Sequence, residues 1–378
     1  MSARPRRLRL TAAVVGVVAV TALGGCADFG AQDRARSAGP FSSETLAPVA
    51  PSPTDPSQPP TSDGPPPSGP CVDPDPAVIA TCLDATSAVM VGDAQGESTI
   101  VAERTTGRIV LTARNAPKKV LATFPVDASG DGGLLDFAMS PTYDQDRLIY
   151  ALVSTASDNR VVRIAPGDVP KPIVTGIPRG TTGNVGSLHF RSPSELLVAT
   201  GDAGDPAAAA DPGSLAGKLL LVTALRSDST ARPRVLASGL GANATICDNA
   251  SSGRLYLTDR APTADRLQII DTSGTLRPLW TWPDRPGVSG CAAAGESVLV
   301  SEAGRQRVEL LVEPTRQNPT VSPPVTVLER RYGVLGRMAA TPSGLFQVGT
   351  LNKQSGRPVA TDDRVVRFLP PNGSQSRV

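Results

Sequence analysis

The pattern of apolar and polar positions from residue 71 onward predicts an all-β fold. Short runs of Val, Ile, Leu and Tyr alternate with clusters of Gly, Asp, Asn and Pro, and long amphipathic helices are scarce. The runs recur in pairs, in which the second run opens with a basic residue. The first runs cover residues 99–102, 148–151, 196–199, 255–258, 298–301 and 345–348. The second runs begin at Arg108, Arg160, Lys218, Arg266, Arg307 and Arg364.

The spacing of these pairs predicts a six-bladed β-propeller over residues 71–378. Successive basic residues are separated by roughly fifty residues, which fits one four-stranded blade each, with insertions in the loops. A β-sandwich or two smaller β domains would be the alternative arrangement of the same strands.

The turn between paired strands is long at residues 201–217 and 349–363. Equivalent loops of a propeller emerge on one face, so we expect both insertions to overhang the same end of the central channel. This face is the predicted site, because loops on a rigid scaffold carry many binding and catalytic residues.

Residues 1–25 are interpreted as a signal peptide rather than as part of the fold. Four arginines accompany an apolar run, residues 10–23, that is short for a membrane span, and Gly24 and Gly25 lead into Cys26. This ending resembles the lipobox of bacterial lipoproteins. It implies that Cys26 is lipidated and anchors an exported protein at the outer face of the cytoplasmic membrane. An ordinary cleaved signal peptide is the alternative, and Arg6-Arg7 leaves a twin-arginine export route open.

Residues 26–70, the lipidated N-terminus and linker, differ abruptly in composition from the rest of the chain. From Pro40 to Pro70 the chain is mostly Pro, Ser, Thr, Gly and Asp, with almost no apolar periodicity. Such a segment buries too little apolar surface to offset its conformational entropy. We therefore predict a disordered tether between the anchor and the folded domain.

Charge and cysteine content limit which partners the protein is expected to bind and which cell compartment it is expected to occupy. The formal net charge is +2, and the signal segment contributes four of the basic residues, so the mature protein is close to neutral. Nucleic acid is therefore not an expected partner, because its binding depends on clustered positive charge. In an exported protein the four remaining cysteines predict two disulfides, with free thiols as the alternative. Three pairings are possible, and we favour Cys71–Cys82, which closes a short loop, with Cys247–Cys291.

Several segments carry a family resemblance. They are Gly132-Gly133-Leu134-Leu135, Asp158-Asn159-Arg160-Val161-Val162-Arg163, Thr200-Gly201-Asp202-Ala203-Gly204-Asp205-Pro206 and Ser214-Leu215-Ala216-Gly217-Lys218. In this order they resemble the glucose/sorbosone dehydrogenase family, which comprises pyrroloquinoline quinone (PQQ)-dependent sugar dehydrogenases built on six-bladed propellers. The likeness runs from about Ser98 to the C-terminus. Within the family the chain is most similar to actinobacterial lipoproteins of the LppZ type.

The resemblance implies a catalytic histidine that removes the proton of a sugar hydroxyl while hydride passes to the quinone. Gly183 occupies that position here, so no catalytic residue is assigned. The single histidine, His189, lies six residues later in a predicted strand. We interpret His189 as an ordinary strand residue, with a relocated base as the alternative.

Other family positions for the quinone are partly retained. The resemblance implies cofactor contacts at Asp131, Asn243, Lys353 and Arg357, with lysine in place of one of two arginines. Lysine keeps the charge but lacks the two-pronged guanidinium contact with a carboxylate. Asp131 is equally compatible with a solvated turn.

Asp202, Asp205 and Asp211 lie close together in the long turn of residues 201–217, here called the acidic loop, and are candidate ligands of a hard cation such as calcium. Their spacing is not that of an EF-hand. Asp is also common in turns for its own backbone hydrogen bonds, so a purely structural role stays open.

Together these patterns favour a membrane-anchored envelope protein whose dehydrogenase site has lost catalysis and which binds a small-molecule ligand or an envelope protein. On this interpretation we expect no cofactor. The alternative is an active PQQ- and calcium-dependent dehydrogenase that oxidises a sugar or alcohol, with another group in place of the histidine.

Overall fold

The computed structural model describes residues 69–226, 231–315 and 320–370. The predicted signal peptide, Cys26 and nearly all of the predicted tether lie outside these residues, as do residues 371–378 of the predicted domain. Among the described residues, no helix is long and apolar enough to cross a membrane.

Strands dominate this part of the chain, which confirms the all-β prediction. The helices of the described residues are short: α1 (Tyr143–Asp146), α2 (Pro206–Ala210) and α3 (Asn352–Ser355). Three sheets each contain four consecutive antiparallel strands. They are formed by β2 (Thr86–Val91), β3 (Ser98–Glu103), β4 (Arg108–Ala113) and β5 (Lys119–Thr123); by β6 (Leu134–Met139), β7 (Ile149–Ser154), β8 (Asn159–Ile164) and β9 (Lys171–Ile177); and by β10 (Ser187–Ser192), β11 (Glu195–Ala199), β12 (Lys218–Val222) and β13 (Arg234–Ser238).

The remaining strands form one eight-stranded and one four-stranded sheet. In spatial order, the larger sheet contains β17 (Leu276–Trp282), β16 (Asp265–Ile270), β15 (Arg254–Arg260), β14 (Ala242–Asn249), β18 (Val288–Ala294), β19 (Ser297–Glu302), β20 (Arg307–Val312) and β21 (Val325–Glu329). The smaller sheet contains β1 (Val78–Ala80), β24 (Val365–Phe368), β23 (Phe346–Thr350) and β22 (Leu335–Ala340).

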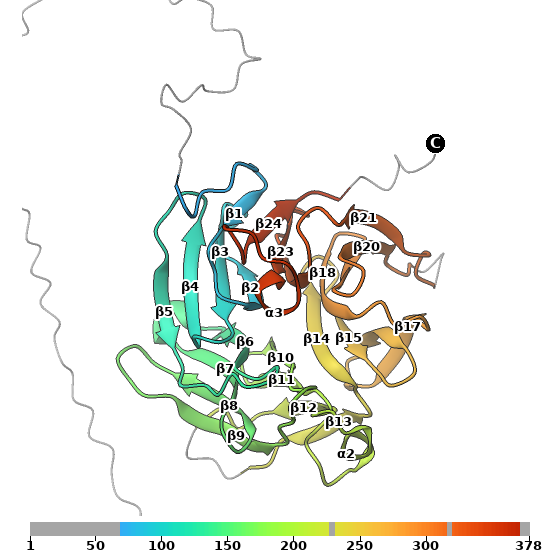
Figure 1. Cartoon of the computed structure of the whole chain (residues 1–378). Coiled ribbons are helices and arrows are strands. Elements are labelled where there is room, and N and C mark those ends of the chain that lie inside the picture. The colour runs from blue at the N-terminus through green and yellow to red at the C-terminus, as the bar shows by residue number, and fades with distance from the viewer. Residues whose placement is uncertain (1–68, 227–230, 316–319, 371–378) are drawn as a thin grey trace, which may run out of the picture. The chain divides into compact units, whose positions relative to one another are not determined.

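The sheets surround a common centre in a β-propeller-like arrangement (Figure 1). The inner strands β2, β6, β10, β14, β18 and β22 contact one another in succession, and β22 contacts β2, so the ring is closed. The predicted first runs lie in β3, β7, β11, β15, β19 and β23, and the basic residues lie at or next to the first residue of the strands that follow. The hairpin pairing read from the sequence is therefore confirmed.

The prediction of six separate blades is not confirmed. Two four-stranded meanders, β14 to β17 and β18 to β21, merge into the eight-stranded sheet because β14 and β18 pair in parallel, with Asn249 opposite Ala293. The predicted Cys247–Cys291 disulfide is present and links the same two inner strands, with 5.8 Å between the Cα atoms. The covalent link and the parallel pairing thus hold the two meanders together.

The N-terminal end of the domain closes the ring. β1 pairs with β24, the last strand of the chain, with Val78 opposite Val366. The second predicted disulfide, Cys71–Cys82, is also present and flanks β1, with 5.6 Å between the Cα atoms. A strand from one end of the chain thereby completes a sheet built from the other end.

The core lies between neighbouring sheets rather than in one central mass. Its buried residues fall into clusters, each of which joins adjacent four-stranded units. Leu197 of β11 and Leu257 of β15, for example, share one cluster and are fully buried. Successive side chains of a strand point to opposite faces of the sheet, and each face packs against a neighbouring cluster. Both faces are therefore buried, which explains why the predicted runs are apolar throughout and do not alternate with polar residues.

We predict that the two disulfides stabilise the domain unequally. Cys247 and Cys291 are 44 residues apart and Cys71 and Cys82 are 11 apart, so the first closes the longer loop. From loop-closure entropy, replacing both cysteines by alanine should lower the free energy of unfolding by about 4 kcal/mol for the first pair and about 3 kcal/mol for the second. Denaturant unfolding of the two double variants under non-reducing conditions measures the difference. A larger loss for the Cys71/Cys82 variant would contradict the prediction.

Candidate functional site

The two long loops border the same end of the ring, as predicted. Leu351, Gln354 and Ser355 of one loop line a cavity of about 470 Å³, here called the loop-side cavity. Asp202 and Pro206 of the other loop line an adjoining shallow pocket, and the two hollows share Asp131, Ala242, Arg260 and Arg285. The loop-side cavity touches the first residues of the inner strands, such as Thr86 and Ser87 of β2, and therefore marks one mouth of the channel.

The acidic loop is held by contacts within itself. The Asp205 side chain caps α2 by accepting hydrogen bonds from the backbone N–H groups of Ala207 (2.9 Å) and Ala208 (3.2 Å). Lys218, which is fully buried, donates from Nζ to the carbonyl oxygens of Ala209 (2.6 Å) and Ala216 (2.8 Å). A charged amine that satisfies loop carbonyls in this way fixes the loop on the strand that follows it.

Asp131 fixes the segment that carries Gly183. Its carboxylate accepts hydrogen bonds from the backbone N–H groups of Gly183 (2.7 Å) and Asn184 (3.2 Å), and also from the Asn184 side chain. The Asn184 amide nitrogen donates in addition to the Gly180 carbonyl oxygen (2.8 Å). Asp131 lines both hollows at this mouth, and its carboxylate is engaged by the protein itself, so its contact with a cofactor stays a prediction.

Gly183 has no space for a side chain. Its φ is +78°, and a Cβ built there would lie 2.4 Å from Asp202 Oδ1 and 2.4 Å from the backbone nitrogen of Gly204. The Asp202 carboxylate therefore occupies the space into which any residue other than glycine would project. Burial raises the pKa of Asp202 above its ordinary value, while a hydrogen bond from the Gly204 N–H opposes the rise.

The structure divides the predicted cofactor contacts. Asn243 lines the loop-side cavity together with Asp131, whereas Lys353 and Arg357 do not. Lys353 Nζ donates instead to the carbonyl oxygen of Leu83 (2.6 Å), and Arg357 is exposed beyond α3. These two residues therefore lie outside the lining of this cavity, and their contact with a cofactor stays a prediction.

The predicted calcium ligands do not converge. Asp202 accepts from the Gly204 N–H (2.9 Å), Asp205 caps α2 and Asp211 accepts from the Gly213 N–H (2.8 Å). No group of three metal-ligating side chains occurs among the described residues. Each carboxylate thus accepts backbone hydrogen bonds of its own turn, as the turn interpretation expects, while a metal-binding role stays a prediction.

The loop-side cavity is instead surrounded by arginines that the sequence reasoning missed: Arg104, Arg260, Arg285 and Arg337. For two of these arginines, the position in the sequence could have indicated that they face the cavity. Arg104 follows Glu103 at the end of β3, and Arg260 follows Asp259 at the end of β15, so both occupy the same position in their units. Side chains alternate along a strand, and the residue after a buried acid at this end faces the cavity.

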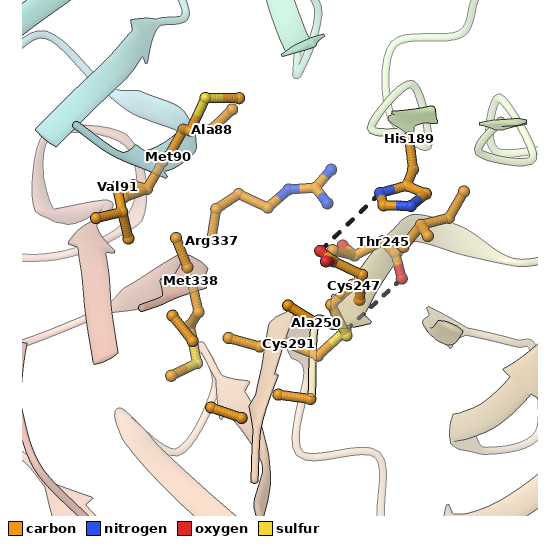
Figure 2. A pocket seen from close by; sticks show the side chains of 18 of the residues that line it. Ala88, Met90, Val91, His189, Thr245, Cys247, Ala250, Cys291, Arg337 and Met338 are labelled. Carbon is orange, nitrogen blue, oxygen red and sulfur yellow. Dashed lines mark hydrogen bonds and ion pairs between the residues drawn. A yellow bond between two sulfur atoms is a disulfide. The ribbon is translucent and has the colours of Figure 1, made fainter. Parts of the chain in front are cut away.

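His189 lies in a different place from Gly183. It lines a second cavity of about 350 Å³, the opposite cavity, which touches the later residues of the inner strands, such as Met90 and Val91 of β2 (Figure 2). His189 Nδ1 is 4.0 Å from Asp248 Oδ1. Burial lowers the pKa of His189, and the Asp248 charge partly offsets this. His189 does not line the loop-side cavity, which argues against a relocated base at that mouth.

Arg337 separates the two cavities and lines both. Its Nη2 donates to the Gly186 carbonyl oxygen at 2.5 Å, and its guanidinium extends toward His189 in Figure 2. Asp136 lines the opposite cavity beside it and accepts a hydrogen bond from the Leu188 N–H (2.7 Å). Burial raises the pKa of Asp136 to about 6, although the Arg337 charge opposes the rise.

Comparison with known proteins finds sequences and structures that are similar to this chain. The sequence profile of the glucose/sorbosone dehydrogenase family matches residues 87–274. The chain is 26% identical over 216 residues to aldose sugar dehydrogenase YliI of Escherichia coli K12; the match covers 44% of this chain and 58% of that relative.

Solved structures show the same fold. The PQQ-bound aldose sugar dehydrogenase of Streptomyces coelicolor matches with a TM-score of 0.68 at 26% identity, over 77% of this chain and 95% of that one. The apo form of the soluble aldose sugar dehydrogenase of Escherichia coli matches with a TM-score of 0.63 at 20% identity, over 77% and 98% of the two chains. The second likeness concerns the fold alone.

The contact between Gly183 and Asp202 predicts a specific effect of substitution. Gly183→Ala should lower the free energy of unfolding by about 2–4 kcal/mol, because the added Cβ is both strained at positive φ and overpacked. Gly176→Ala is the matched control: Gly176 has a φ of +76° but no atom within 4 Å of the added Cβ. It should cost about 1 kcal/mol. Equal losses in denaturant unfolding would show that the Asp202 contact exerts no strain.

Proposed function

Because the chain is glucose/sorbosone dehydrogenase-like over residues 87–274, we propose that it is an envelope lipoprotein that retains the sugar dehydrogenase scaffold but binds a ligand at the loop-side cavity without oxidising it. The observation that carries this proposal is the packing at Gly183. The position expected to hold the catalytic base has no side chain and no volume for one, since Asp202 fills it.

The charge of the loop-side cavity fits the carboxylates of PQQ. Arg104, Arg260 and Arg285 would hold them, since guanidinium groups form paired hydrogen bonds with carboxylates. When bound, PQQ supplies a hydride acceptor. The residues of this chain would bind and orient such a ligand, but Asp131, at the same mouth, already accepts several hydrogen bonds and is poorly suited to take a hydroxyl proton.

One observation favours a second candidate function, an active PQQ-dependent dehydrogenase. The Asp202 carboxylate lies beside Gly183, and burial raises its pKa, which makes it a stronger base than an ordinary aspartate. In that case Asp202 would replace the histidine and remove the hydroxyl proton of an aldose or alcohol. Its hydrogen bond from Gly204 would hold the carboxylate in place.

We predict no turnover. Purified domain mixed with PQQ, Ca²⁺ and a redox dye should reduce no dye above background over a panel of aldoses and alcohols, because no base replaces histidine at Gly183. The Streptomyces coelicolor aldose sugar dehydrogenase serves as the positive control, and Asp202→Asn as the matched variant. Dye reduction that Asp202→Asn abolishes would overturn the proposal and establish the second candidate. Dye reduction that persists in Asp202→Asn would overturn it as well.

The proposed anchor is tested separately. Cys26 follows the small residues of the lipobox-like segment. We propose that it carries the lipid, as the likeness to LppZ-type lipoproteins implies. Cys26→Ala should move most of the protein from the membrane fraction to the soluble extracellular or periplasmic fraction, because one acyl-bearing residue provides the attachment. Fractionation of cells that express wild type and Cys26→Ser alongside gives the comparison. Full membrane retention of both variants would show that the anchor lies elsewhere.

A further inference from the structure

The opposite cavity has an apolar half and a polar half. The inner strands β2, β18 and β22 contribute mainly apolar residues to its lining, among them Met90 and Met338. The titratable side chains other than that of Arg337 come from the inner strands β6, β10 and β14: Asp136, His189 and Asp248. Each set of three strands is continuous around the ring, so the two halves face each other, as Met90 and His189 do in Figure 2. A ligand of this cavity therefore needs an apolar part and a polar part.

The cavity has an exposed rim and a buried floor. Asp248, Ala250 and Pro342 belong to its lining and are exposed, so they form the rim through which the cavity opens to solvent. Asp136 and Arg337 are only 8% and 6% exposed and form the floor. The volume of about 350 Å³ is at the small end of the range for ligand pockets, so the cavity fits a small metabolite.

The floor carries two opposite charges that do not pair with each other. Arg337 donates to the Gly186 carbonyl oxygen, and the Asp136 carboxylate accepts from the Leu188 N–H. Among the contacts of the described residues, no hydrogen bond or ion pair joins Arg337 to Asp136. The two groups are nevertheless close, because burial raises the pKa of Asp136 and the charge of Arg337 opposes the rise. Both buried charges are therefore only partly compensated within the protein.

The balance of charge in the opposite cavity favours a ligand that carries both signs. Arg337 and Asp136 contribute one charge of each sign at the floor, and His189 is largely uncharged at neutral pH because burial lowers its pKa. Asp248 adds a negative charge at the rim, where its side chain is 54% exposed and screened by solvent. The floor thus offers no excess charge to a simple anion or a simple cation, whereas a zwitterion compensates both buried groups at once.

We propose that the opposite cavity binds a neutral α-amino acid with an apolar side chain. The carboxylate of this zwitterion accepts hydrogen bonds from the Arg337 guanidinium, and its ammonium group donates to the Asp136 carboxylate. Its side chain packs against Met90 and Met338, and methionine adapts to apolar groups of different shape. The site lies at the other end of the channel from the loop-side cavity, so this inference does not depend on the proposed function.

The test compares amino acids with analogues that lack one of the two charges. Isothermal titration calorimetry of the purified full chain, at neutral pH and physiological ionic strength without quinone or calcium, measures binding of L-leucine and L-phenylalanine. Isocaproate and hydrocinnamate are the matching acids without the ammonium group, and isoamylamine and phenethylamine are the matching amines without the carboxylate. At least one amino acid should bind, and both of its analogues should bind at least about tenfold more weakly, because each leaves one charge of the floor unsatisfied.

Asp136→Asn assigns the ammonium contact. Asparagine lacks the charge but keeps an oxygen that can accept from the Leu188 N–H. The variant should weaken binding of the amino acid at least about tenfold without weakening binding of the matching acid, which has no ammonium group. A merely structural role of Asp136 would weaken both. Asp144→Asn is the matched control, since Asp144 is exposed in α1 and lies outside the lining of the cavity; it should leave every affinity unchanged.

Three results would overturn the proposal: no binding of either amino acid up to millimolar concentration, an analogue that binds as tightly as its amino acid, or equal weakening of amino acid and matching acid by Asp136→Asn. If Asp136→Asn does not fold, the comparison of amino acids with their analogues on the unchanged chain still decides. Sugar and quinone are absent from these titrations, so failure here leaves the prediction of no sugar turnover in place.

Discussion

The mouth of this domain depends on an ion pair between a buried carboxylate and a partly exposed arginine, at the turn between the second and third strands of a unit. The pair recurs in five four-stranded units with nitrogen–oxygen distances of 2.5–2.8 Å: Glu103–Arg108, Asp158–Arg160, Asp259–Arg266, Glu302–Arg307 and Asp362–Arg364. A buried carboxylate that lost its partner would cost several kcal/mol, so each pair holds its turn in one geometry. Some of these acids also bind a neighbouring chain segment, as Asp259 does by accepting from the Gly241 N–H at 2.7 Å.

The unit that lacks this pair is the one that carries the acidic loop. Thr200 stands near the end of its second strand, and Lys218 opens the third strand without an ion-pair partner among the described residues. The lysine instead binds carbonyl oxygens of the loop itself. The same basic position thus pairs with a carboxylate in the other units, among them the one with the long turn at residues 349–363, and binds carbonyl oxygens of the insertion here. This difference places Asp202 against Gly183.

The sequence was sufficient for features that depend on local pattern. Apolar runs, the basic residues that follow them, both disulfide pairings and the shared face of the two long loops could all be predicted, because hairpins and covalent links follow short-range rules. The merged sheet could not, since the pairing of Asn249 with Ala293 depends on how neighbouring units meet. The arginines of the cavity come from separate units, so only the closed ring brings Arg104 and Arg260 together with Arg337. Lys353 and Arg357 lie outside the lining of the cavity, and the contact of Lys353 with Leu83 could not be predicted because the two residues are far apart in the sequence.

The absence of room for a side chain at Gly183 and the fixed position of the loop beside it result from the same packing. A histidine at position 183 would require the Asp202 carboxylate and the Gly204 nitrogen to move, yet the loop that carries them is fixed by Asp205 and Lys218. Asp131 holds the other side of the contact through the backbone of Gly183. A single substitution therefore cannot restore the histidine without displacing the loop. The guanidinium groups of the cavity are held independently, by carbonyls of other segments such as Gly132 and Gly186. The contacts at Gly183 and those of the cavity arginines are therefore separate, so a change in one set does not require a change in the other.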